Sequence, residues 1–178
     1  AGKGGHHHPE LLYVELLDEN NQPVAPGEEG EVTITTLGVE GMPLLRYKTG
    51  DICQYQQDTC SCGRHTLRLS PVIGRKKQMI KYKGTTLYPP ALFDLLNDME
   101  EVKEFVVEVY SNELGTDEIL LHLWPTEVSE EMDRKIKSYL QAKLRVIPQV
   151  KYCGQQDIMR MQFPENSRKP VKFVDNRS

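Results

Sequence analysis

Residues 79–153 carry strand and helix patterns in the order β-α-β-β-α-β, which limits the fold more than any other feature of the sequence. A hairpin about Gly84 is expected from residues 79–83 and 85–88. Pro89-Pro90 then opens a helix, and strands are expected at 104–110 and 118–124. Ser129 is the expected N-cap of a helix that runs to about Arg145. This order predicts a compact α+β domain, an open sheet with flanking helices.

The first 70 or so residues have a different character, because short strands follow one another with little helix between them. Strands are expected at 11–18, 31–36, 44–47 and 52–55. Such a unit is short of core by itself, as if cut from something larger. We therefore predict two domains, residues 1–74 and 75–178, of which the second closes with a strand near 150–153 and an irregular tail.

The charge pattern bears on the class of ligand. The net charge of −4 argues against nucleic-acid binding, which needs a broad basic surface. Residues 74–84 nevertheless carry five cations and no anion, which suits a small anionic ligand, although on charge alone a solvated lysine-rich hairpin is the better explanation. No apolar run approaches the ~18 residues of a membrane span, and no signal peptide is apparent, so a cytoplasmic location is predicted.

Three separated segments point to a chemistry. They are residues 46–51 (Arg-Tyr-Lys-Thr-Gly-Asp), the basic segment 74–84, and residues 164–175 of the tail. Their order and separation resemble the adenylate-forming superfamily of acyl-CoA synthetases, luciferases and adenylation domains. Residues 28–31, 35–37, 41–47 and 60–64 are similar to the phenylacetate-CoA ligase branch. The resemblance covers nearly the whole chain but only about the last two-fifths of such an enzyme, so the domain that precedes it is expected to be missing.

The resemblance implies a nucleotide site in the first unit, which would be the β-rich end of the large AMP-binding domain. Asp51 matches the aspartate that holds both ribose hydroxyls of ATP or AMP, since one carboxylate accepts two hydrogen bonds. Arg75 matches the arginine that reaches the ribose region, and Tyr47 and Thr49 belong to the same motif. Without the resemblance, a Thr-Gly-Asp turn is a common capped loop.

The second unit would be the mobile C-terminal domain of such a ligase. Lys169 matches the catalytic lysine that bridges the substrate carboxylate and the α-phosphate, where negative charge accumulates in the transition state. The resemblance also implies a catalytic role for Lys81. Residues 81–84 match the hairpin that lines the pantetheine path in this family. Lys77 matches the position of the superfamily's hinge residue, about which the small domain rotates between an adenylating and a thioester-forming pose. Taken alone, Lys169 would be a surface lysine in a frayed tail.

The resemblance implies an ATP-dependent acid–CoA ligase that forms an acyl-adenylate and then a thioester, with ATP, Mg²⁺ and coenzyme A as cofactors and an aryl acid as the expected substrate. The alternatives are an adenylating enzyme that passes the acyl group to a carrier protein or an amine, and a non-catalytic binding module. The chain alone is expected to be inactive, because it has no glycine-rich phosphate loop. Exposed apolar surface on the β-rich unit favours a homodimer.

The cysteines suggest a metal site. Cys60-x-Cys62 follows Cys53 by seven positions, and His6 falls where the phenylacetate-CoA ligase branch has a Gly-x-His element. Four such ligands could hold a structural zinc ion tetrahedrally. Reduced loop cysteines beside a solvent-facing histidine run account for the pattern equally well.

Overall fold

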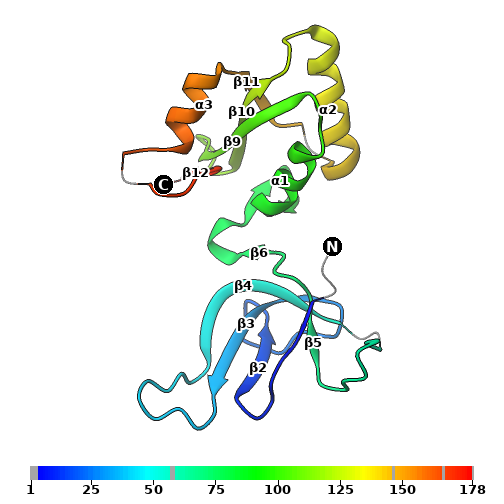
Figure 1. Ribbon diagram of the computed structural model, residues 1–178, viewed down its shortest axis with the longest axis vertical. Coiled ribbons are helices and arrows are strands. Elements are labelled where there is room, and N and C mark those ends of the chain that lie inside the picture. Colours follow the sequence, from blue (N-terminus) through cyan, green and yellow to red (C-terminus); the bar gives the residue numbers. More distant parts are fainter. Residues whose placement is uncertain (1–3, 57–58, 146, 166, 178) are drawn as a thin grey trace. The chain divides into compact units, whose positions relative to one another are not determined.

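The computed structural model describes residues 4–56, 59–145, 147–165 and 167–177, and it divides into two compact units, Ala1–Lys77 and Gln78–Ser178 (Figure 1). The division lies three residues beyond the predicted boundary at 74/75. The reason is that Gly74–Arg75 forms strand β6, which pairs antiparallel with strand β4 of the first unit. Arg75 therefore belongs to the first unit.

The first unit is an antiparallel sheet in the order β1-β5-β4-β3-β2, with β6 paired to β4. Its buried apolar cluster is small and centres on Leu16, Val32 and Cys53. Several large apolar side chains of this unit are exposed, among them Met42 at 77% and Leu45 at 82%. The strands are β1 (Gly5–His6), β2 (Leu12–Leu17), β3 (Glu29–Thr36), β4 (Tyr47–Gln56) and β5 (Arg68–Leu69).

Strand β4 replaces two predicted strands. The sequence analysis expected separate strands at 44–47 and 52–55, with the Thr49-Gly50-Asp51 turn between them. The structure instead has one strand, Tyr47–Gln56, whose pairing with β3 shifts register between Glu31 and Thr33. An irregularity of this kind lets a strand continue while one side chain is aimed differently.

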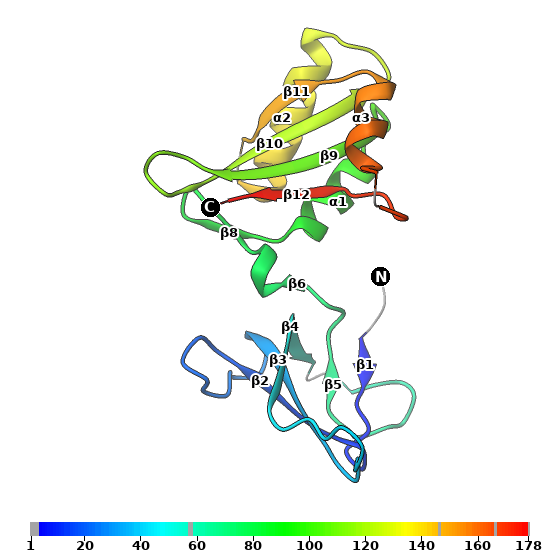
Figure 2. The ribbon, with the colours of Figure 1, turned by 90° about the vertical axis from the view of Figure 1, so that its left-hand side faces the viewer.

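The second unit has a four-stranded mixed sheet in the order β11-β10-β9-β12 (Figure 2). Strands β9 and β10 are antiparallel, while β11 and β12 each run parallel to their neighbour. A separate hairpin, β7–β8, precedes the first helix. The strands are β7 (Ile80–Tyr82), β8 (Thr85–Leu87), β9 (Val102–Ser111), β10 (Asp117–Pro125), β11 (Gln149–Tyr152) and β12 (Phe173–Asn176).

Three helices cover this sheet. Helix α1 (Pro89–Asn97) and helix α2 (Glu130–Leu144) lie on one face, and α3 (Gln155–Gln162) lies on the other (Figures 1 and 2). Helix α2 begins as predicted, because the Ser129 hydroxyl accepts the amide of Met132 at 3.1 Å. Its apolar stripe packs with α1 and with alternate residues of β9 and β10 in one core.

The tail is not irregular, contrary to the expectation. Residues 155–162 form α3, whose Gln162 side chain donates to the carbonyl of Phe105 at 3.1 Å. Residues 173–176 form β12, which pairs with Val107–Tyr110 of β9. Tertiary contacts that a single sequence does not reveal hold both segments in place. The fold class is α+β, as predicted, and no helix in the described part of the chain is long and apolar enough to cross a bilayer.

Candidate functional site

Thr49, Gly50 and Asp51 form the irregular part of β4, here named the Thr49 turn, which holds Asp51. The Thr49 hydroxyl donates to the carbonyl of Val32 at 3.0 Å and accepts the amide of Asp51 at 3.1 Å. Gly50 between them has φ +80°, a conformation that favours glycine. The threonine thus ties the turn to β3 and presents the Asp51 carboxylate, about a third exposed, at the surface of the first unit.

Arg75 lies beside this carboxylate. Asp51 and Arg75 are paired positions of β4 and β6, and Arg75 Nε lies 3.4 Å from Asp51 Oδ1. The arginine side chain is 70% exposed, so its interaction with Asp51 is screened by water and contributes little to stability. The structure therefore brings together the two residues predicted for the ribose, in a form open to solvent. Tyr47, half exposed, begins the same strand.

Lys81 lies on the exposed side of the β7–β8 hairpin, whose loop has two residues. Lys83 and Gly84 have φ of +47° and +80°, as a type I′ turn requires, and the Lys81 backbone pairs with Thr86. Ile80 and Tyr82 point into the core, so Lys81 faces outward. A Cβ on Gly84 would meet no atom within 4 Å, so in this structure the need for glycine comes from the backbone conformation.

The hairpin is anchored by two residues that the sequence analysis missed. Asp117 Oδ2 accepts the Lys81 amide at 2.7 Å and lies 3.1 Å from Arg177 Nη1. The same Arg177 nitrogen donates to the carbonyl of Met79 at 2.7 Å. Asp117 and Arg177 are 60 positions apart in sequence. Asp117 lies in none of the three motifs, and Arg177 lies just after the tail motif, so no local signal identifies them.

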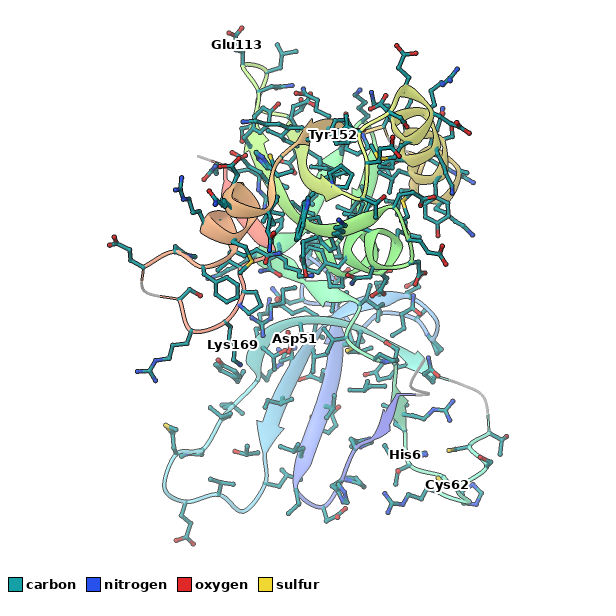
Figure 3. All side chains as sticks on the ribbon, turned by 45° about the horizontal axis from the view of Figure 1, so that its top comes forward. His6, Asp51, Cys62, Glu113, Tyr152 and Lys169 are labelled. Carbon is teal, nitrogen blue, oxygen red and sulfur yellow. The ribbon has the colours of Figure 1, made fainter. Side chains whose placement is uncertain are left out.

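Lys169 lies in the loop between α3 and β12 and is exposed (Figure 3). The loop is attached at both ends: the Val171 amide donates to the Gln162 carbonyl at 2.8 Å, and the Val107 amide donates to the Lys172 carbonyl at 2.9 Å. Asn166 of the tail motif lies outside the described residues. Lys169 is thus presented by an anchored loop and not by a frayed end.

Lys77 lies in the 3₁₀ turn Lys76–Gln78, and the two units meet in the chain directly after it. Its neighbour Lys76 belongs to the first unit, where Lys76 Nζ lies 2.8 Å from Glu31 Oε2. The predicted hinge therefore falls at the junction of the units.

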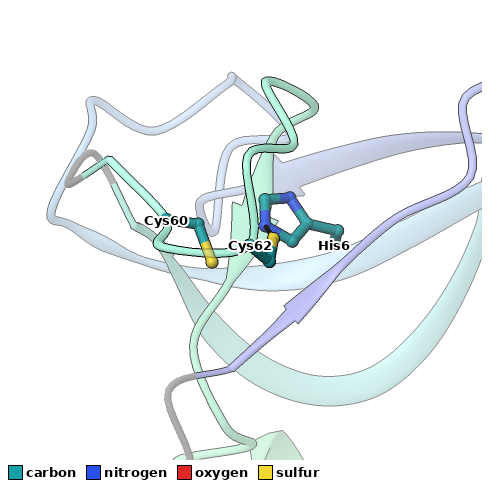
Figure 4. A group of neighbouring side chains, drawn as sticks. All are labelled: His6, Cys60 and Cys62. Atoms are coloured by element: carbon teal, nitrogen blue, oxygen red, sulfur yellow. Dashed lines mark hydrogen bonds between the residues drawn. The ribbon is translucent and has the colours of Figure 1, made fainter.

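Three of the four predicted metal ligands come together in the first unit. Ligand atoms of His6, Cys60 and Cys62 lie within 4.8 Å of one another, and their side chains converge (Figure 4). Cys53 is not part of this group. It lies on β4 with its side chain buried against Leu16 and Val32, and burial raises the pKa of its thiol. The predicted set of four is therefore corrected to three.

The surroundings of Cys60 favour its thiolate. A hydrogen bond from the Cys62 amide, followed by contacts with the side chains of His6, Cys62 and Arg68, lowers the pKa of Cys60 to about 6. The cluster borders an open cavity of about 890 Å³, lined by residues that include His65 and Arg68. His6 and Cys60 line this cavity and Cys62 is exposed, so a small ion or a solvent molecule can reach the group.

Comparisons with known proteins agree with the motifs. The phenylacetate-coenzyme A ligase of Thermus thermophilus is 34% identical over 135 residues, which are 75% of this chain and 30% of that protein. The enzyme of the same name from Aromatoleum evansii is 34% identical over 86 residues, 48% of this chain and 19% of that protein. The chain thus spans about a third or less of these relatives. No family model matches it.

Solved structures share the fold. A 2-hydroxyisobutyryl-CoA ligase in its postadenylation state covers 98% of this chain with a TM-score of 0.79 and 23% identity, and the match spans 38% of that protein. The o-succinylbenzoate CoA synthetase of Bacillus subtilis covers 89% of this chain with a TM-score of 0.59, over 34% of that protein. The chain is therefore homologous to part of the phenylacetate-coenzyme A ligases, and it shares its fold with part of the solved CoA ligases.

Proposed function

We propose that this chain is the C-terminal part of an AMP-forming acid–CoA ligase, which joins a carboxylic acid to AMP and then to the thiol of coenzyme A. The observation that carries the proposal is the Asp51–Arg75 pair, because the two residues matched to the ribose site are 24 positions apart in the sequence yet lie side by side on β4 and β6. Homology to the phenylacetate-coenzyme A ligases supports the same assignment.

The geometry of that pair supports the proposed nucleotide site. The Thr49 turn holds the Asp51 backbone, and the carboxylate, about a third exposed, can accept the two ribose hydroxyls. Arg75 lies within 3.4 Å and keeps the carboxylate beside a fixed positive charge. Tyr47, half exposed at the start of the same strand, offers an aromatic face and a hydroxyl. The binding site for ATP and Mg²⁺ would be completed by a phosphate loop from the preceding domain.

Two lysines of the second unit are proposed to act in different steps. Lys169, on its anchored loop, would balance the negative charge that builds between the acid and the α-phosphate during adenylation. Lys81 and Gly84, on the hairpin, would line the path of coenzyme A in the thioester step. The junction after Lys77 is the proposed hinge between these two poses.

The remaining assignments belong to the same proposal. An aryl acid is the proposed substrate class, and the cytoplasm is the proposed location. The exposed apolar side chains of the first unit, with Met42 and Leu45 foremost, would dock the preceding domain, and in the isolated chain they would promote a homodimer. A monomer by light scattering at high concentration would contradict that last expectation.

The test uses the full-length protein that contains this chain. Pyrophosphate release is measured over a panel of aryl and fatty acids, and acyl-CoA formation is measured with and without coenzyme A. Lys169→Ala is expected to lower pyrophosphate release by about 10²–10³-fold, as for loss of a group that stabilises transition-state charge. Arg168→Ala, which removes a neighbouring exposed cation from the same loop, is the matched control and is expected to change little.

Lys81→Ala separates the two steps. It is expected to leave pyrophosphate release intact while slowing acyl-CoA formation. If no acid releases pyrophosphate, or if Lys169→Ala behaves like Arg168→Ala, the ligase proposal is wrong. If adenylation proceeds but coenzyme A accepts nothing, the acyl group goes to a carrier protein or an amine instead.

A further inference from the structure

We propose that His6, Cys60 and Cys62 supply three of the four ligands of a zinc ion that ties strand β1 to the loop between β4 and β5. This inference goes beyond the proposed ligase function and does not rest on it. The donor atoms come from segments far apart in the sequence, since Cys62 and His6 are separated by 56 positions. Their convergence is a product of the fold.

The distances suit a tetrahedral ion. Cys62 Sγ lies 3.4 Å from His6 Nε2, and the three ligand atoms lie within 4.8 Å of one another. With Zn–S of about 2.3 Å and Zn–N of about 2.0–2.1 Å, tetrahedral sulfur and nitrogen ligands lie about 3.6 Å apart. Small side-chain rotations are enough to place all three donors around one ion.

The His6 ring is already oriented as a ligand. Its Nδ1 lies 2.7 Å from the carbonyl oxygen of Thr66, which can only accept, so Nδ1 carries the proton. The lone pair is therefore on Nε2, the atom that faces Cys62. Metal-binding histidines commonly donate their second ring N–H to a carbonyl or carboxylate in this way. This hydrogen bond is independent of the cysteine spacing and points to the same site.

The backbone around each donor is constrained. His6 pairs with Arg68 in the β1–β5 ladder, and a Cβ on Gly4 would lie 1.9 Å from the Leu69 carbonyl oxygen, so only glycine permits this close approach. On the other side, the Gly63 amide closes a turn by donating to the Cys60 carbonyl at 3.2 Å. The turn sets both thiols on one side of the loop (Figure 4).

The donor set selects zinc. Two thiolates and an imidazole suit a borderline-soft divalent ion that accepts tetrahedral geometry. With both cysteines bound as thiolates, their two negative charges balance the charge of the ion. His6 and Cys60 line the open cavity, so water or a further donor could supply the fourth ligand from that side.

The test is metal binding by the 178-residue chain. The protein is stripped with a chelator under reducing conditions and titrated with Zn²⁺ and, separately, with Co²⁺, whose thiolate charge-transfer absorption reports cysteine ligation. One ion per chain is expected. Cys60→Ser and Cys62→Ser should each lower zinc affinity by at least 10–100-fold, the loss typical of groups that only support a ligand. Cys153→Ser and His8→Ala, which change a thiol and an imidazole outside the group, should bind as the parent does.

A second readout does not depend on the variants. Zinc is expected to slow amide hydrogen exchange in β1 and in residues 59–67 of the loop before β5, which the ion would join, and to leave exchange in the second unit unchanged. Absence of a thiolate–cobalt band, equal binding by Cys60→Ser and the parent, or a Cys60–Cys62 disulfide under these conditions would each overturn the proposal. None of these results affects the ligase test, which reads pyrophosphate release.

Discussion

Replacing Gly30 by alanine tests whether the β2–β3 contact supports the first unit. A Cβ on Gly30 would lie 2.9 Å from Leu16 Cβ, 3.0 Å from the Leu16 carbonyl carbon and 3.0 Å from the Leu17 nitrogen. Carbon atoms pack best at about 3.5–4.0 Å, so β2 would have to move by roughly 0.5 Å. Two of the three atoms are backbone, and they cannot turn aside as a flexible side chain could.

The expected net effect is a loss of about 1–2 kcal/mol of unfolding free energy in the first unit. Overpacking costs about 1–3 kcal/mol, while replacing glycine by alanine returns about 0.4–1 kcal/mol by restricting the unfolded chain. The small core around Leu16 and Val32 leaves little reserve to absorb the loss. Because β3 also holds the Thr49 turn, the loss should spread to Asp51.

Hydrogen exchange by mass spectrometry over 12–17 and 29–36 measures this effect in the first unit. Trp124, the one tryptophan of the sequence, lies in the second unit, so its fluorescence on urea unfolding is an internal control that should not change. Gly41→Ala is the matched control, since its Cβ would meet no atom within 4 Å. Equal protection in Gly30→Ala and Gly41→Ala would refute the packing argument.

Three further outcomes are expected. The hydrogen bond from His122 lowers the pKa of Glu108. The Glu108 carboxylate therefore stabilises the fold above its unfolded pKa of about 4.3, and this effect is lost as pH falls through the lower folded value. The difference in stability between Glu108→Gln and the parent, measured by urea unfolding, should disappear in that acid range. Asp117→Ala removes the acceptor of the Lys81 amide and should cost about 1.5 kcal/mol, seen as roughly tenfold faster exchange in the hairpin; unchanged exchange there would show that the anchor is not needed. Ser129→Ala removes the cap of α2 and should cost about 1 kcal/mol in Trp124-monitored unfolding, whereas a neutral result would mean that solvent replaces the cap.

The elements predicted from the sequence are those whose signal is local. Helix α2 has a capping serine and an apolar stripe at helical spacing, and both are visible in one window of residues. The β7–β8 hairpin is marked by Gly84 between two short apolar segments. In each case the residues that favour the element are the residues within it, so no distant contact had to be known.

Helix α3 and strand β12 were missed because their stability comes from elsewhere. Helix α3 has only eight residues, of which Ile158 and Gln162 are buried, and the Gln162 side chain holds it on the backbone of β9. Strand β12 has four residues and depends on pairing with β9, about 65 positions earlier. A pattern read along the chain contains neither contact.

The candidate sites divide in the same way. Spacing suggested Cys60 and Cys62 as candidate metal ligands and the family resemblance suggested His6, yet spacing also selected Cys53, because it does not reveal which way a strand side chain points. Successive side chains of a strand face opposite sides, and the register of β4 against β3 turns Cys53 toward Leu16 and away from the loop. Motifs thus indicate which residue types the chemistry needs. The residues that hold them in place, such as Asp117, which accepts the Lys81 amide, become apparent only from the tertiary structure. It follows that substitutions at Asp117 should impair the proposed role of the β7–β8 hairpin in lining the coenzyme A path, although every motif residue is unchanged.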